Sequence, residues 1–72
     1  MKCYVIRYTM YQGAEVKMVY LNARNKEEAY DKAVYEEIVK KEGTMPYSAW
    51  VESVTYSNGR MIRFNTFEGK PY

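Results

Sequence analysis

The amino-acid sequence predicts an α+β domain of the order ββαββ, in which two antiparallel hairpins flank one helix. One segment with helix-capping residues carries apolar side chains at a helical period. The regions before and after it alternate apolar and polar residues with a period of two, and each contains a glycine-bearing turn. We expect a four-stranded antiparallel sheet with the helix packed on one face.

The first hairpin is predicted from two runs rich in Val, Ile, Tyr and Met, which cover residues 3–11 and 16–21. The tripeptide Gln12-Gly13-Ala14 separates them and supplies the turn. A three-residue loop sorts the side chains into two sets, one of Tyr4, Ile6, Tyr8, Met10, Val16, Met18 and Tyr20, the other of Cys3, Val5, Arg7, Thr9, Tyr11, Lys17, Val19 and Leu21. A two-residue loop would mix these sets, and the sequence leaves both loops open.

The helix is predicted over residues 26–42. Asn25 is a good N-cap, and Glu28 stands at the spacing at which its side chain can reach back to the cap amide. Gly43 supplies the left-handed residue that ends many helices, and Pro46 prevents continuation. The apolar stripe consists of Ala29, Tyr30, Ala33, Val34 and Ile38.

The second hairpin is predicted from residues 47–56 and 61–67, which are joined by Ser57-Asn58-Gly59-Arg60. Asn-Gly between two such runs is the strongest short signal for a two-residue type I′ turn. That turn would place Tyr56 opposite Met61 and Val54 opposite Arg63.

This register sorts the second hairpin into two faces. One carries Trp50, Glu52, Val54, Tyr56, Met61, Arg63, Asn65 and Phe67, and the other carries Ala49, Val51, Ser53, Thr55, Ile62, Phe64 and Thr66. Burying Glu52 and Arg63 under the helix would cost several kcal/mol per charge unless they paired well. We therefore expect the helix to cover the face with Ala49 and Ile62, and the face with Trp50 to lie on the outside of the sheet.

The residue types argue against an enzyme. The chain has no histidine, so it lacks the ordinary acid–base group near neutral pH and the commonest metal ligand. Cys3 lies in a predicted strand and is interpreted as a small apolar residue. The four glycines are scattered and form no phosphate-binding loop. We expect no catalytic residue, no cofactor and no metal.

Length and composition predict one small cytoplasmic domain. The chain has 72 residues, a mass of 8.6 kDa and a net charge of +2. We assign residues 1–67 to the domain and residues 68–72 to a C-terminal tail that glycine and proline keep out of regular structure. A single cysteine, and no apolar run long enough for a secretory signal or a membrane span, predict a cytoplasmic location.

The sequence therefore predicts a non-enzymatic protein–protein interaction module that binds through the outer face of its sheet. The candidate contact residues are Tyr11, Trp50, Tyr56, Met61, Arg63 and Phe67. The expected partner is another protein or a second copy of the chain. Small binding proteins of this kind include adaptors, inhibitors and accessory proteins of phages and plasmids. The alternative is a nucleic-acid-binding module, in which aromatic side chains act together with Arg7, Lys17, Arg60 and Arg63.

Overall fold

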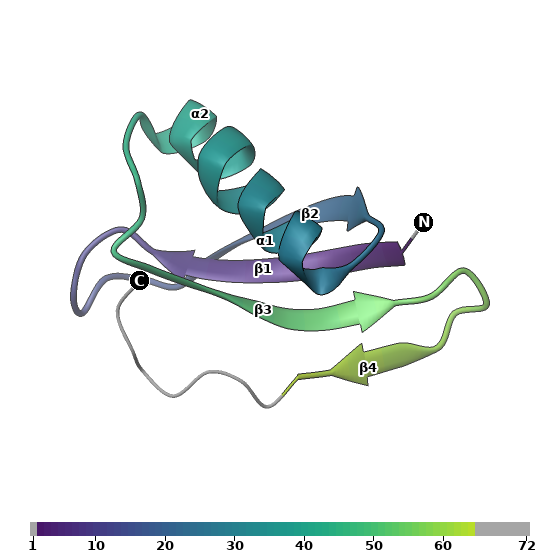
Figure 1. The fold of residues 1–72 in the computed structure, drawn as a ribbon. Coiled ribbons are helices and arrows are strands. Elements are labelled where there is room, and N and C mark those ends of the chain that lie inside the picture. Colours follow the sequence, from purple (N-terminus) through teal and green to yellow (C-terminus); the bar gives the residue numbers. More distant parts are fainter. Residues whose placement is uncertain (1, 65–72) are drawn as a thin grey trace.

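The structure is a computed structural model and describes residues 2–64 of the chain. The strands are β1 (Lys2–Thr9), β2 (Lys17–Ala23), β3 (Ser48–Thr55) and β4 (Met61–Arg63), and the helix has three parts, α1 (Lys26–Lys32), η1 (Ala33–Ile38) and α2 (Val39–Glu42). The four strands form one antiparallel sheet of order β2-β1-β3-β4, and the helix lies across one of its faces (Figure 1). The ββαββ prediction is confirmed. Residues 65–72, which include Phe67 and the predicted tail, lie outside the described part.

The core lies between β1, β3 and the helix. Tyr4, Ile6 and Tyr8 alternate along β1 and are fully or almost fully buried. They face the helix, whose buried side chains include Ala29 and Ala33. Because alanine side chains end at Cβ, they let the helix backbone approach the sheet closely. The rest of the buried apolar cluster consists of Ala23, Ile38, Val51 and Val54. These residues hold the sheet against the helix because their burial removes apolar area from water.

The first hairpin mixes the two predicted sets of side chains. In its register Tyr8 lies opposite Lys17 and Ile6 opposite Val19, so the clean separation expected of a three-residue loop is wrong. The connection is longer, and its turn is closed by a 3.0 Å hydrogen bond from the Ala14 N–H to the Tyr11 carbonyl. Gly13 supplies the positive φ of 79° that the third position of a type II turn requires.

The helix begins and ends where its capping residues predict. The Asn25 side chain accepts a 2.8 Å hydrogen bond from the Glu28 N–H, and Gly43 ends the helix with a φ of 83°. The Glu28 carboxylate accepts its return bond from the N–H of Arg24, one residue before the expected cap amide. The reason is that the Arg24 guanidinium binds the same carboxylate at 2.8 Å.

The middle of the helix, η1, is a π-helix. A continuous α-helix turns by about 100° per residue, so it would place Ala29 and Ile38 on opposite sides of the helix, about 180° apart. Both side chains are nevertheless fully buried. The wider i→i+5 turn rotates less per residue and brings Ile38 back towards the sheet.

The second hairpin uses a three-residue loop, and the predicted type I′ turn is wrong. Gly59 has a φ of 89°, whereas no residue other than glycine has a positive φ in the described chain, so Asn58 does not adopt the conformation that type I′ needs. The Gly59 N–H donates to the Tyr56 carbonyl at 2.9 Å. This is the type I turn with a glycine bulge that closes three-residue loops. Met61 consequently lies opposite Thr55 and not opposite Tyr56.

A bulge in β3 changes the faces of that strand. The β1–β3 register shifts between Val5, which faces Ser53, and Ile6, which faces Val51, so Glu52 is the extra residue. After the bulge, Val54 points into the core and Tyr56 packs against it, so their assignment to the outer face is wrong. The assignment of Ser53 and Thr55 to the helix side is wrong as well, because they pair with Val5 and Cys3 on the opposite side of the sheet. The one-residue shift of the hairpin then cancels the bulge, because Ile62 pairs with Val54 and packs on the core side, as predicted.

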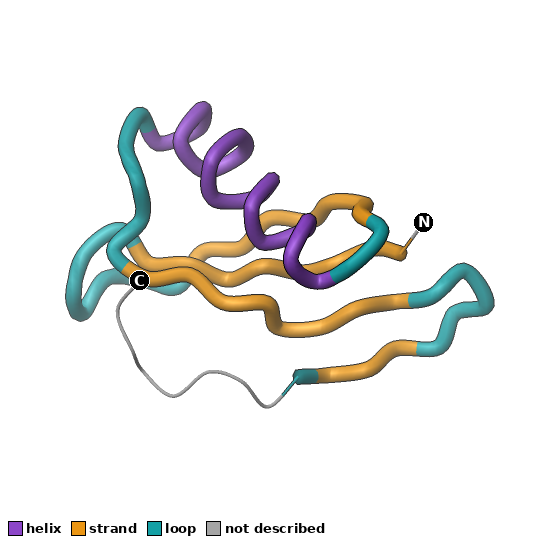
Figure 2. Tube along the Cα trace, in the orientation of Figure 1, coloured by secondary structure: helices purple, strands orange, loops and turns teal. Residues whose placement is uncertain are grey.

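The described chain has two layers, and its smallest principal extent is 17 Å. The helix covers one face of the sheet, and the figure shows no second helical layer on the other (Figure 2). Within residues 2–64, no helix combines the length and the apolar character needed to cross a bilayer.

Candidate functional site

The sheet face opposite the helix gathers charged, aromatic and methionine side chains from all four strands. We call it the outer face and define it by Val5 and Arg7 of β1, Met18 and Tyr20 of β2, Trp50 and Glu52 of β3, and Met61 and Arg63 of β4. Strand alternation places these side chains opposite the core, except at the bulge, where Glu52 is placed by its contact with Arg7. No helix or strand of residues 2–64 covers this face.

A three-residue ion network occupies the centre of the outer face. The Arg7 Nε donates a hydrogen bond to the Glu52 carboxylate across β1 and β3. Arg63 of β4 approaches the same carboxylate at 4.0 Å. The side chains of Arg7 and Glu52 are 31% and 20% exposed, whereas that of Arg63 is 68% exposed. The network leaves one net positive charge, and Arg63 presents it to solvent.

Apolar side chains lie on both sides of the ion network. Met18 is 37%, Tyr20 66% and Met61 52% exposed, which is high for side chains of their size on regular strands. Tyr, Trp, Met and Arg are the residue types enriched where proteins bind other proteins. Exposed side chains of these types make the outer face the candidate binding surface of the described chain.

The structure brings together three of the six predicted contact residues. Trp50, Met61 and Arg63 lie on the outer face, with Trp50 partly buried. Tyr11 lies in the turn after β1 and is 68% exposed. Tyr56 packs against the core, and the Lys2 Nζ lies 5.7 Å from its ring centroid. Phe67 lies outside the described residues.

Met18 and Tyr20 were missed because the sequence does not determine the register of the first hairpin. In the three-residue register they share a face with Ile6 and Tyr8. In the structure Met18 faces Arg7 and Tyr20 faces Val5. A one-residue difference in register therefore decides whether two large side chains lie in the core or on the outer face.

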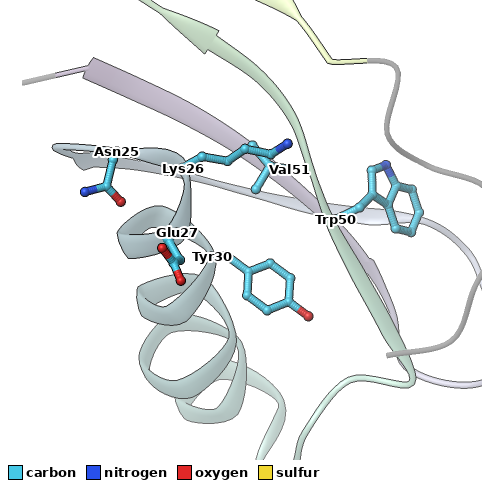
Figure 3. A pocket seen from close by; sticks show the side chains of 6 residues that line it. All are labelled: Asn25, Lys26, Glu27, Tyr30, Trp50 and Val51. Atoms are coloured by element: carbon cyan, nitrogen blue, oxygen red, sulfur yellow. The ribbon is translucent and has the colours of Figure 1, made fainter.

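A hollow lies between the start of the helix and β3. It has a volume of about 580 Å³ and is lined by Asn25, Lys26, Glu27, Tyr30, Trp50 and Val51 (Figure 3). Two of its polar groups serve the fold. The Asn25 side chain caps the helix, and the Lys26 Nζ lies 4.5 Å from the centroid of the Phe64 ring. Among the described residues, no three His, Cys, Asp or Glu side chains are grouped as metal ligands.

A partly buried polar cluster joins the sheet to the C-terminal end of the helix. The fully buried Tyr8 donates a 2.8 Å hydrogen bond from its hydroxyl to the Glu42 carboxylate, which also binds the Lys17 ammonium at 3.1 Å. Burial, and then the hydrogen bond and charge of Glu42, raise the pKa of Tyr8 to about 12. The hydrogen bonds from Tyr8 and Lys17 lower the pKa of Glu42. This arrangement stabilises a neutral phenol and an ionised carboxylate, so it anchors the helix and is poorly suited to proton transfer near neutral pH.

Comparisons with protein-family models, with curated protein sequences and with solved structures found no match to the chain.

Proposed function

We propose that this chain is a small non-enzymatic protein–protein interaction module that binds a partner protein through the outer face. The observation that carries the proposal is the set of exposed Met18, Tyr20 and Met61 around the Arg7–Glu52–Arg63 network. They lie on the side of the sheet that no helix or strand of residues 2–64 covers. An adaptor or an inhibitor uses such a surface, because its activity is the binding itself. The cytoplasmic location stays a prediction.

The charge of the outer face indicates the chemistry of the partner. Arg7 is already neutralised by Glu52, and Arg63 is the most exposed of the three charged side chains. A complementary surface therefore carries apolar side chains opposite Met18 and Met61 and a carboxylate opposite Arg63. A like charge opposite Arg63 would disfavour a wrong partner.

The geometry favours a protein over a nucleic acid. Two of the four cations of the nucleic-acid hypothesis are held by carboxylates, Arg7 by Glu52 and Lys17 by Glu42. Lys17 also reaches a residue of the helix, which lies on the opposite side of the sheet from the outer face. Stacking of bases would need cations beside the aromatic rings to meet the phosphates. Among those four cations, Arg60 and Arg63 are exposed, whereas Arg7 and Lys17 are partly buried.

The test is affinity capture from the native host with the full chain as bait, followed by a binding titration with each purified protein recovered. The bait variants are Met61→Glu and Arg63→Glu. Met45→Glu is the matched control, because Met45 is 38% exposed and lies outside the sheet. We expect a directly binding protein whose affinity falls at least tenfold in the two outer-face variants, about 1.4 kcal/mol, and is unchanged in the control.

Two results would contradict this proposal. One is a partner that binds the outer-face variants as tightly as the wild type. The other is capture that disappears when the lysate is treated with nuclease, together with an affinity for purified DNA or RNA that falls steeply with salt. The second result would establish the nucleic-acid alternative.

A further inference from the structure

Strand β2 (Lys17–Ala23) forms an edge of the sheet. β1 pairs with it on one side, and no strand of the described chain pairs with it on the other. In an antiparallel ladder, alternate residues direct their backbone N–H and C=O groups to opposite sides of the strand. The outward groups of β2 therefore form a row that a further antiparallel strand can pair with.

This edge lacks most of the features that soluble proteins use to prevent pairing, because its single inward-pointing charge, Lys17, stands at the end of the strand. Protected edges carry prolines, bulges, inward-pointing charges or very short strands. β2 has seven residues, contains no proline, and pairs with β1 over its whole length without a register shift. Its one charged residue is Lys17, at the first position, and the Lys17 ammonium is held 3.1 Å from the Glu42 carboxylate.

We propose that β2 is a dimerisation edge, at which two copies of the chain pair their β2 strands antiparallel about a twofold axis at Tyr20. In this register Tyr20 faces Tyr20 of the partner subunit, and Val19 faces Leu21 of the partner subunit. Met18 faces Asn22 of the partner subunit, and Lys17 faces Ala23 of the partner subunit. The two sheets become one continuous sheet with both helices on the same side.

The occupant is a second copy because β2 is complementary to itself in this register. A twofold antiparallel pair joins residues at equal distances from the axis, so an axis at the central residue Tyr20 uses all seven positions and any other axis leaves some unpaired. The only charged side chain, Lys17, meets Ala23 and not another charge. The aromatic pair at the axis adds to the stability of the ladder.

The edge is a different surface from the outer face, so this proposal does not rest on the proposed function. The two are compatible, because a twofold axis perpendicular to the sheet would join the two outer faces into one larger surface. Pairing along a single strand buries less than the roughly 1,200–2,000 Å² of a standard stable interface. We therefore expect a reversible dimer with a dissociation constant in the micromolar range.

The first test is sedimentation velocity of the full chain from about 1 μM to about 1 mM. We expect the monomer to convert to a dimer across this range. Tyr20→Lys places like charges at the axis, and the 66% exposed side chain allows the monomer to fold. This variant is expected to weaken association at least tenfold. The matched control is Tyr11→Lys, whose side chain is 68% exposed but lies outside β2.

The second test reports the register by disulfide cross-linking. Cys3 is first replaced by Ser, because it lies opposite Asn22 in the β1–β2 pair. In that background, Met18→Cys and Asn22→Cys chains are expected to cross-link when mixed and not when either is oxidised alone. Met61→Cys, on the far edge strand, is the control that should stay uncrosslinked.

A wild-type chain that stays monomeric at every concentration would overturn the proposal and would leave the outer face untouched as a binding surface. A dimer that persists in Tyr20→Lys, or that gives no mixed cross-link between Met18→Cys and Asn22→Cys, would overturn it as well. A dimer lost in Met61→Glu but retained in Tyr20→Lys would show that the copies meet through their outer faces.

Discussion

At the scale of single residues, the Tyr8 hydroxyl joins the centre of the sheet to the last turn of the helix. It donates to Glu42 from a fully buried position, so removing it leaves a partly buried carboxylate with fewer donors. The cost of an unsatisfied buried group exceeds the net gain of an ordinary hydrogen bond. Tyr8 is therefore more important for stability than its neighbours on the exposed parts of the strands.

We predict that Tyr8→Phe lowers the free energy of unfolding by about 1–3 kcal/mol at pH 7. The difference from the wild type should shrink between pH 10 and 12, because the pKa of Tyr8 rises from 10.0 to about 12 on folding and its contribution is lost as the pH passes through that window. It should also shrink as the pH falls below 4.5, the ordinary pKa of Glu42, and through the lowered pKa of Glu42 in the folded chain, because protonation removes the charge that accepts the Tyr8 hydrogen bond.

Urea unfolding followed by circular dichroism at a series of pH values measures this difference. The control is Tyr20→Phe, because Tyr20 is 66% exposed. If the difference in free energy of unfolding between Tyr8→Phe and the wild type stays constant from pH 7 to 12, folding does not raise the pKa of Tyr8 and this prediction is wrong.

At the scale of elements, the helix is fitted to the sheet by its π-helical middle. The apolar side chains of α1 and η1 recur at intervals of four to five residues, from Ala29 through Ala33 and Val34 to Ile38. This spacing is too long for a regular α-helix to keep all of them on the sheet. The wider turn of η1 matches this spacing and keeps these side chains on the sheet. Packing against the sheet stabilises the π-helical turn.

We predict that Ile38→Ala lowers the free energy of unfolding by about 2–5 kcal/mol, because the side chain is fully buried. In a continuous α-helix Ile38 would point away from Ala29, and the same change would cost little. Val39→Ala is the comparison, since Val39 is only partly buried. Chemical denaturation gives both values, and Ile38→Val, at about 1 kcal/mol, replaces Ile38→Ala if that variant does not fold. A larger loss for Val39→Ala would contradict the π-helical turn.

At the scale of the whole molecule, one helix covers one face of a four-stranded sheet, and the other face carries the side chains proposed to bind a partner. The face that holds the monomer together and the face proposed to bind are thus different. Substitutions on the outer face should change binding without changing the fold. This separation also makes the controls of the binding experiments interpretable.

We predict that Met61→Glu changes the free energy of unfolding of the monomer by no more than about 0.5 kcal/mol. The side chain is 52% exposed and supports no other described side chain in the core cluster. Thermal or urea unfolding at a concentration below that of any dimer measures it. A loss of more than about 2 kcal/mol would mean that the outer face is part of the stabilising core.

The sequence by itself determined the element order, both ends of the helix and the position of the turns. These features depend on neighbouring residues, such as the Asn25 cap and the left-handed Gly43, so they can be recognised locally. It also placed Trp50, Met61 and Arg63 on the correct face, although two errors of one residue cancelled to give that result. The bulge at Glu52 and the three-residue loop closed by Gly59 account for those errors.

Only the tertiary structure decided the registers of both hairpins, the bulge and the π-helical turn. Each alternative differs by one residue and has nearly the same local energy, yet it moves every following side chain to the opposite face. The favoured register is the one that buries the most apolar surface over the whole sheet and helix, and a local segment of the sequence does not carry that information. For this reason Met18 and Tyr20 were found on the outer face, and Val54 and Tyr56 on the core side, only in the folded chain.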